Sequence, residues 1–289
     1  MHDLALSRRD WLASAATVAG ASMLAPAAAM SAPSAPGRLR QSVCRWPFSR
    51  VPFPEFARSV RAMGLEAVDL VTEEEWPIVR DAGLVVSMVT PTTRSDFLTN
   101  GLNDRAHHAV VLRELERAIE GAARFGWPNV IAMPGNRRGK TDAEIVDTTV
   151  EALRRITPLA EERRVTIHLE MLNSRVDHRD FSVDTTALGV AIAQGTGSPR
   201  VKLLYDVYHM QIMEGDVIRT METHASYIGH VHTAGVPGRH EIGEQQELQY
   251  PAIMRALASR GFSGFVAHEF VPTGPWEAAL RDAVTRCTV

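Results

Sequence analysis

The chain has 289 residues, of which 45% are hydrophobic and 22% are charged, and its formal net charge is −3. These values are typical of a folded globular protein and exclude a disordered tail, a collagen-like repeat and a coiled coil. The slightly acidic balance, without a long basic run, argues against nucleic acid as the main partner. A chain of this length buries a large core, either as one α/β barrel or as two smaller domains.

The first thirty residues carry the pattern of an export signal. Arg8 and Arg9 precede a stretch, residues 12–29, that is rich in Ala and Gly and ends in three alanines. A twin arginine followed by a small-residue cleavage site is typical of a twin-arginine signal. We therefore expect residues 1–30 to be this signal, residues 31–38 to be a linker, and the mature protein to be periplasmic, without stable membrane insertion. A membrane anchor facing the periplasm is the alternative, although the segment is only marginally hydrophobic for a bilayer span.

Residues 39–289 alternate between short apolar runs and longer amphipathic segments. Strands buried on both faces read as continuous apolar runs, and the expected strands are 40–45, 66–70, 84–90, 129–133, 165–170, 201–206, 227–232 and 265–269. The clearest helical periodicity lies at 103–125, 142–163, 184–194 and 276–286. Eight such units in about 250 residues predict an α/β fold, a single-domain (β/α)8 TIM barrel over residues 39–289. A doubly wound open sheet is the alternative, but no Gly-x-Gly-x-x-Gly sequence follows the first strand.

Each of the last four expected strands ends in an ionisable residue: Glu170, Asp206, His232 and Glu269. A barrel brings the carboxyl ends of its strands together at the mouth where active sites lie. Three carboxylates buried there without a partner would cost several kcal/mol, which a divalent cation would offset. The sequence therefore predicts one divalent metal ion, Mn²⁺ or Mg²⁺ from the oxygen-rich ligand set, with Co²⁺, Fe²⁺ and Zn²⁺ compatible with the histidine.

The same part of the chain resembles a known family. The segments Leu-Glu-Met-Leu-Asn at 169–173, Tyr-Asp-Val-Tyr-His-Met-Gln-Ile-Met-Glu-Gly-Asp within 201–216, and His-Val-His at 230–232 resemble the hydroxypyruvate isomerases among the xylose isomerase-like TIM barrels. Segments 236–241 and 249–251 resemble them as well, and the similarity is close over residues 165–269. The resemblance implies a metal-dependent isomerase that interconverts hydroxypyruvate and 2-hydroxy-3-oxopropanoate (tartronate semialdehyde) by enediolate proton transfer. Glu170 and Glu269 would be its acid and base.

The fourth expected metal ligand departs from that family. Carried over by position, the resemblance makes Glu170, Asp206 and Glu269 metal ligands, but the family usually has Gln where this chain has His232. Histidine at this position is similar to the ketose 3-epimerases, which also share the spacing of Asp206 and His209. An exported ketose 3-epimerase, or another keto-sugar isomerase or lyase, is therefore the alternative, and a non-catalytic sugar-binding barrel is a third reading. A DNA-repair endonuclease of this superfamily is a distant fourth alternative. It would need several metal ions and a basic groove, whereas this sequence shows one four-residue cluster and a net charge of −3.

Two further residues are expected to bind the small hydroxy-keto acid or sugar substrate. His209, expected at the start of the loop after Asp206, would donate to a substrate oxygen; a helix N-terminal residue without a role is the alternative. Arg239 would hold a substrate carboxylate or hydroxyl, with a solvated surface arginine as the alternative. A homodimer is common among such barrels.

Three aromatic residues and the two cysteines also lie at places where a role can be expected. Trp46, Phe48 and Trp76 lie near the ends of early strands and would either wall the pocket or pack ordinarily. Cys44 and Cys287 fall in the first strand and the last helix, which adjoin where a barrel closes. A disulfide between them is compatible with an oxidising compartment, although the sequence does not give the distance.

Overall fold

Eight parallel strands close into a barrel in the computed structural model, which describes residues 38–289. Each strand pairs with the next along the chain, and the ring closes because β1 pairs with β8 from Arg40 opposite Phe265 to Val43 opposite His268. The expected signal, residues 1–30, and the linker up to residue 37 lie outside the described residues. The strands are β1 Arg40–Cys44, β2 Ala67–Val71, β3 Val85–Val89, β4 Asn129–Ala132, β5 Thr166–Glu170, β6 Val201–Asp206, β7 Ile228–Thr233 and β8 Phe265–His268.

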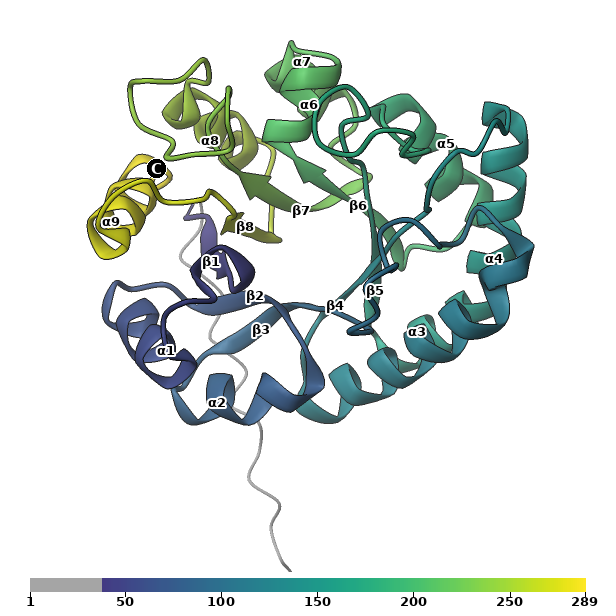
Figure 1. Ribbon diagram of the computed structural model, residues 1–289, viewed down its shortest axis with the longest axis horizontal. Helices are drawn as coiled ribbons and strands as arrows, with labels where there is room; N and C mark the ends of the chain where they lie inside the picture. The colour runs from purple at the N-terminus through teal and green to yellow at the C-terminus, as the bar shows by residue number, and fades with distance from the viewer. Residues whose placement is uncertain (1–37) are drawn as a thin grey trace, which may run out of the picture. The chain divides into compact units, whose positions relative to one another are not determined.

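Helices surround this ring of strands (Figure 1). They are α1 Phe53–Ala62, α2 Trp76–Asp81, α3 Arg105–Phe125, α4 Asp142–Arg163, α5 Thr186–Thr196, α6 Val207–Met213, α7 Val217–Thr223, α8 Tyr250–Ser259 and α9 Trp276–Arg286, with short 3₁₀ helices η1 Trp46–Phe48 and η2 Glu73–Glu75. The predicted TIM barrel is confirmed, with a strand at each of the eight expected places. In the part of the chain that the structure describes, no helix is long and apolar enough to cross a membrane.

The ends of the long helices α3 and α4 are set by capping residues in the sequence. The Asp104 side chain accepts from the amide of Ala106 at the start of α3, and Gly126 ends that helix in the left-handed conformation that glycine adopts without strain. Thr141 and Glu144 form a capping box at the start of α4. These signals explain why the predicted helices at 103–125 and 142–163 appear within two residues of their expected bounds.

Aromatic and aliphatic side chains fill the layer between the strands and the helices. Two of the three aromatic residues that the sequence analysis considered as pocket walls, Phe48 and Trp76, lie in this layer. Phe48 stacks on Phe56 of α1, and Trp76 packs against Trp127 with ring centroids 4.9 Å apart. On α3, a side chain at Gly121 would lie 2.6 Å from the Trp76 ring, so the glycine makes room for the tryptophan. Phe48 and Trp76 are therefore core residues and not pocket walls.

Part of the barrel interior is filled by polar side chains from β1, β2 and β7. Cys44 of β1 contacts His232 of β7 at 3.8 Å, and Asp69 of β2 contacts His230 of β7 at 2.6 Å. These strands are not neighbours in the ring, so both contacts cross the interior. The buried polar groups therefore lie directly beneath the carboxyl ends of the last strands, where the candidate site is.

Candidate active site and metal centre

The four residues singled out at the strand ends converge. Glu170 and Asp206 are the last residues of β5 and β6, His232 is next to last in β7, and Glu269 follows β8. One ligand atom from each lies within 4.8 Å of the others. All four side chains are buried, with at most 4% of any residue exposed. The arrangement is a compact cluster of three carboxylates and one imidazole.

The electrostatics of the cluster fit a divalent cation. Burial raises the pKa of Glu170, and it raises the pKa of Asp206 to about 7 although Arg239 acts in the opposite direction. Burial also acts to raise the pKa of Glu269, but Arg239 and His232 outweigh it and hold that pKa well below its ordinary value. Asp206 Oδ2 has no hydrogen-bond partner. The pKa of His232 is raised well above its ordinary value, so the three carboxylates face two cations, Arg239 and His232, in the absence of metal. As a metal ligand His232 would be neutral, and the three carboxylates beside Arg239 would then leave two negative charges, which a divalent ion would balance.

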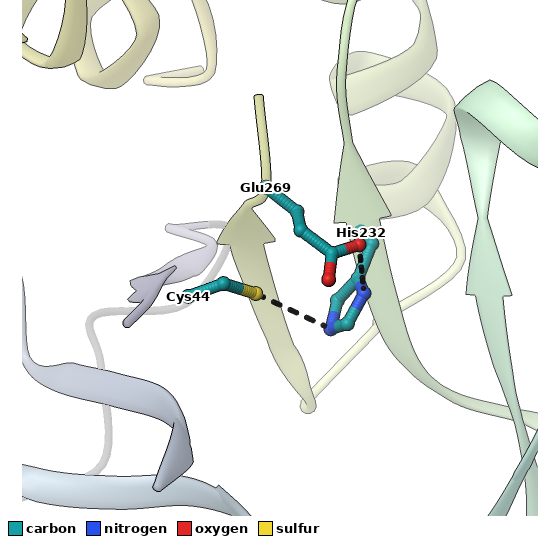
Figure 2. A group of neighbouring side chains, drawn as sticks. All are labelled: Cys44, His232 and Glu269. Carbon is teal, nitrogen blue, oxygen red and sulfur yellow. Dashed lines mark hydrogen bonds and ion pairs between the residues drawn. The ribbon is translucent and has the colours of Figure 1, made fainter. Parts of the chain in front are cut away.

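His232 lies between this cluster and a second set of groups in the barrel interior (Figure 2). Its Nδ1 is 2.9 Å from Glu269 Oε2 and 3.6 Å from Glu170 Oε1, while its Nε2 is 3.8 Å from the Cys44 sulfur. Asp69 Oδ1 also lies 3.4 Å from Nε2. The Nδ1 atom therefore faces the carboxylate cluster, and Nε2 is turned toward Asp69 and Cys44.

Cys44 does not fit the role of a metal ligand. Burial raises the pKa of its thiol well above the ordinary value, which disfavours the thiolate that binds metals. Cys44 and Cys287 are both free and buried, so the structure contains no disulfide between them. The cluster of Glu170, Asp206, His232 and Glu269 is therefore the better candidate for a metal centre.

Arg239, which the sequence analysis singled out as a candidate substrate-binding residue, lies beside the carboxylate cluster. It sits in the loop between β7 and α8 with a left-handed backbone (φ 60°). Its Nη2 donates to Glu269 Oε2 at 2.6 Å and is 3.6 Å from Asp206 Oδ2. The guanidinium also lies over the rings of Trp46 and Tyr208. Arg239 is thus held by aromatic and carboxylate groups and is not a solvated surface arginine.

His209 is buried beside Asp206, in a helix and not in the loop that the sequence suggested. It is the third residue of α6, which begins at once after β6 because the Asp206 carboxylate accepts from the amide of Tyr208. The side-chain amide of Asn173 donates to His209 Nδ1 at 2.7 Å. That contact leaves the hydrogen on Nε2, which lies 3.5 Å from Asp206 Oδ2 and has no hydrogen-bond partner. His209 therefore offers an N–H donor at the edge of the cluster.

Asp69 is the buried group that the sequence analysis missed. It lies in the middle of the apolar strand β2 and is fully buried. Its Oδ2 accepts from Ser87 Oγ at 2.9 Å and contacts His230 Nε2 at 2.6 Å. Burial acts to raise the pKa of Asp69, but His230 and His232 outweigh it and hold that pKa well below its ordinary value. The sequence feature that could have indicated it is a single acidic residue inside the otherwise apolar run of β2.

Trp46 is the one of the three early aromatic residues that reaches the site. It is 42% exposed, and its indole Nε1 donates to Glu269 Oε1 at 2.6 Å. It follows β1, which pairs with β8 where the ring closes, so Trp46 lies beside the residue that follows β8, Glu269.

Replacement of Trp46 by Phe is expected to lower turnover about 10- to 100-fold. The change keeps an aromatic ring but removes a hydrogen bond to a charged group, which contributes about 1.5–3 kcal/mol. The rate of substrate conversion at saturating metal measures the effect. Trp276→Phe is the matched control, because Trp276 packs against Phe48 in the outer core and should affect stability and not turnover.

The family to which this architecture belongs follows from comparison with known proteins. Residues 60–287 match the family described as xylose isomerase-like TIM barrel, so the chain belongs to that family. A human relative with hydroxypyruvate isomerase in its name is 29% identical over 238 residues, which cover 76% of this chain and 84% of the relative. The 2-oxo-tetronate isomerase of Cupriavidus necator is 32% identical over 165 residues, 57% of this chain and 63% of the relative. The chain is an enzyme of the isomerase class.

Solved structures show the same fold. A family 2 AP endonuclease from Brucella melitensis superposes with a TM-score of 0.77 at 23% identity, covering 86% of this chain and 99% of that one. The 3-keto-D-glucoside 4-epimerase of Escherichia coli superposes with a TM-score of 0.71 at 20% identity, covering 86% and 98%. At these identities the likeness establishes the barrel and does not identify the substrate.

Proposed function

We propose that the chain is a metal-dependent isomerase that interconverts hydroxypyruvate and 2-hydroxy-3-oxopropanoate. The observation that carries the proposal is the buried cluster in which Glu170 and Glu269 flank Asp206 and His232. The names of the human and Cupriavidus relatives support a small 2-oxo acid as substrate. A purely binding role would not require two buried glutamates beside one ligand site.

The reaction moves hydrogen between two adjacent carbons through an enediolate. One glutamate takes a proton from C3 of hydroxypyruvate, and a glutamate returns a proton to C2, while the hydroxyl proton passes from O3 to O2. Glu170, Asp206, His232 and Glu269 would hold Mn²⁺ or Mg²⁺, which supplies positive charge where the oxyanion develops. Arg239 would bind the substrate carboxylate, and His209 Nε2–H would donate to a substrate oxygen.

Proton NMR in D₂O tests this proposal. The chain without residues 1–30 is loaded with Mg²⁺ and given hydroxypyruvate, 2-oxo-tetronate or a set of ketoses. Deuterium at C3 of hydroxypyruvate together with the appearance of tartronate semialdehyde is the expected result. No exchange with either 2-oxo acid, in protein that binds the metal, would overturn it.

A ketose 3-epimerase is the second candidate function. His232 occupies the position of the fourth ligand in the resemblance to ketose 3-epimerases, and the solved 3-keto-D-glucoside 4-epimerase, an epimerase of another sugar position, has the same fold. In that reaction the two glutamates would work on opposite faces of C3 of a ketose. Deuterium incorporation at C3 of a ketose, with inversion there, would favour this function over the isomerisation.

Divalent metal is expected to stabilise the folded protein as well as to permit turnover. A ligand present at 100 times its dissociation constant contributes about 2.7 kcal/mol, which corresponds to a rise in Tm of roughly 5–10 °C for a domain of this size. Thermal melts with EDTA and with Mn²⁺ or Mg²⁺ measure the shift. Asp206→Asn should remove most of it, whereas Asp282→Asn, which changes an exposed carboxylate on α9, should not. Equal Tm values with and without metal would contradict the metal centre.

We also propose that the enzyme works in the periplasm after export by the twin-arginine route. The basis is the sequence of residues 1–30, with Arg8 and Arg9 ahead of a small-residue stretch. Changing both arginines to Lys should retain the protein in the cytoplasmic fraction. Export that is unaffected by this change would contradict the route, and a membrane-bound mature protein would favour the anchor.

A further inference from the structure

A cavity of about 440 Å³ lies at the end of the barrel opposite the carboxylate cluster. Its lining includes Arg40, Asn129 and Phe265, the first residues of β1, β4 and β8. The cluster lies at the other ends of the strands, at Glu170 and Asp206. The cavity is therefore separate from the proposed isomerase site, and its size is that of a site for a small molecule.

The charges around this cavity are mainly positive. Its described lining residues include four basic side chains, Arg40, Arg200, Lys202 and Arg260, and one carboxylate, that of Glu222. Within residues 38–289, Arg40 pairs with Glu66 and Arg260 with Glu222.

Two of these cations are not neutralised. Arg200 Nη1 contacts the Thr166 hydroxyl at 3.4 Å, and Lys202 Nζ donates to the Ser226 carbonyl at 2.7 Å. Neither side chain has a carboxylate within 4.0 Å among the residues that the structure describes. Both line the cavity, so its wall presents positive charge that no acidic side chain balances.

A buried histidine completes the lining. His168 is 1% exposed, and neither of its ring nitrogens has a hydrogen-bond partner. The neutral ring carries one N–H. A side chain at Gly229 would lie 2.6 Å from His168 Nε2, so the glycine keeps room for the imidazole. An unsatisfied buried donor costs free energy that a bound acceptor would recover.

We propose that this cavity binds a small anion that carries a phosphate or carboxylate group. Arg200 and Lys202 would hold the anionic group, and His168 would donate to an oxygen that reaches the inner wall. Met221, Leu257 and Phe265 also line the cavity and would contact a hydrocarbon part of the ligand. This binding site is additional to the isomerase site and does not depend on the proposed function.

Cations at this end of the barrel have another use, because helix carboxyl ends attract positive charge. Arg200 follows the end of α5 at Thr196, and Arg260 follows the end of α8 at Ser259. If stabilising this end of the barrel were the whole role of the cavity's cations, replacing Arg200 and Lys202 would lower the Tm, and the wild-type protein would bind no anion in the cavity. The two roles therefore give different results in a binding experiment.

The test is calorimetric titration of the chain without residues 1–30, at constant ionic strength, with inorganic phosphate and with succinate as separate probes. Saturable binding of at least one probe is expected, and the stronger probe indicates whether phosphate or carboxylate is preferred. The double variant Arg200→Gln, Lys202→Met should weaken that binding at least ten-fold. Arg113→Gln, at an exposed position on α3, is the matched control that should leave it unchanged.

A crystal of the wild-type protein soaked in tungstate gives a second readout that does not require the variant to fold. An anomalous peak beside Arg200 and Lys202 is expected. Absence of saturable binding, equal binding by the double variant, or a tungstate peak only beside Arg239 would overturn the proposal. None of these results bears on the isomerase activity, which the exchange experiment measures separately.

Discussion

Replacing Glu170 or Glu269 by Gln is expected to lower turnover about 10²- to 10⁴-fold, the usual contribution of a positioned acid or base. Glutamine keeps the size of the side chain and an oxygen for hydrogen bonding, but it does not take or return a proton. Both glutamates are also expected metal ligands, so turnover is measured at saturating Mg²⁺ and metal binding is measured separately. Product formation by proton NMR gives the rate.

Exchange of deuterium into hydroxypyruvate distinguishes the two glutamates. Loss of the first base removes exchange at C3, whereas loss of the group that protonates C2 stops product formation and leaves exchange at C3 in place. Glu74→Gln is the matched control, because Glu74 is exposed on η2. Wild-type rates in both the Glu170 and the Glu269 variants would exclude the mechanism.

The strands and the cluster at their ends were predictable for the same physical reason. Strands buried on both faces are continuous apolar runs, so an ionisable residue at the end of such a run stands out. Glu170 and Asp206 end β5 and β6 in this way, and the closed ring brings them together. The short helix α6 has seven residues, too few to show a helical period, which is why the sequence predicts a loop at His209 where the structure has a helix.

The polar interior of the barrel was harder to predict. Asp69 interrupts an apolar run, which by itself does not reveal a partner. Its partners Ser87 and His230 lie on β3 and β7, and only the closed ring brings β2 and β7 face to face. The register between β2 and β3 also shifts on both sides of Asp69, an irregularity that the alternation of residues does not encode.

Asp69→Asn is expected to weaken Mn²⁺ binding about 10- to 100-fold, the usual effect of removing a carboxylate that orients a metal-binding histidine. His232 turns Nδ1 toward Glu269 and Nε2 toward Asp69, at 2.9 Å and 3.4 Å. Burial acts to lower the pKa of His232, but the anionic groups on its two sides outweigh it and raise that pKa well above its ordinary value, so both ring nitrogens carry hydrogen without metal. A metal ion would take the place of the Nδ1 hydrogen, and Asp69 would then hold the remaining N–H at Nε2. Asparagine retains the shape but loses the charge, and its amide would offer hydrogens toward the two histidines.

Calorimetric titration with Mn²⁺ measures this affinity, and the spectrum of bound Mn²⁺ reports any change in its ligands. Ser87→Ala is the matched control, because it removes one hydrogen bond to Asp69 and leaves the negative charge in place. The control should lower the Tm and change the Mn²⁺ affinity little. If Asp69→Asn lowers only the Tm and binds Mn²⁺ as tightly as wild type, then Asp69 stabilises the barrel interior and does not orient His232. A loss of Mn²⁺ affinity with a folded protein would instead extend the metal centre from the strand ends to β2.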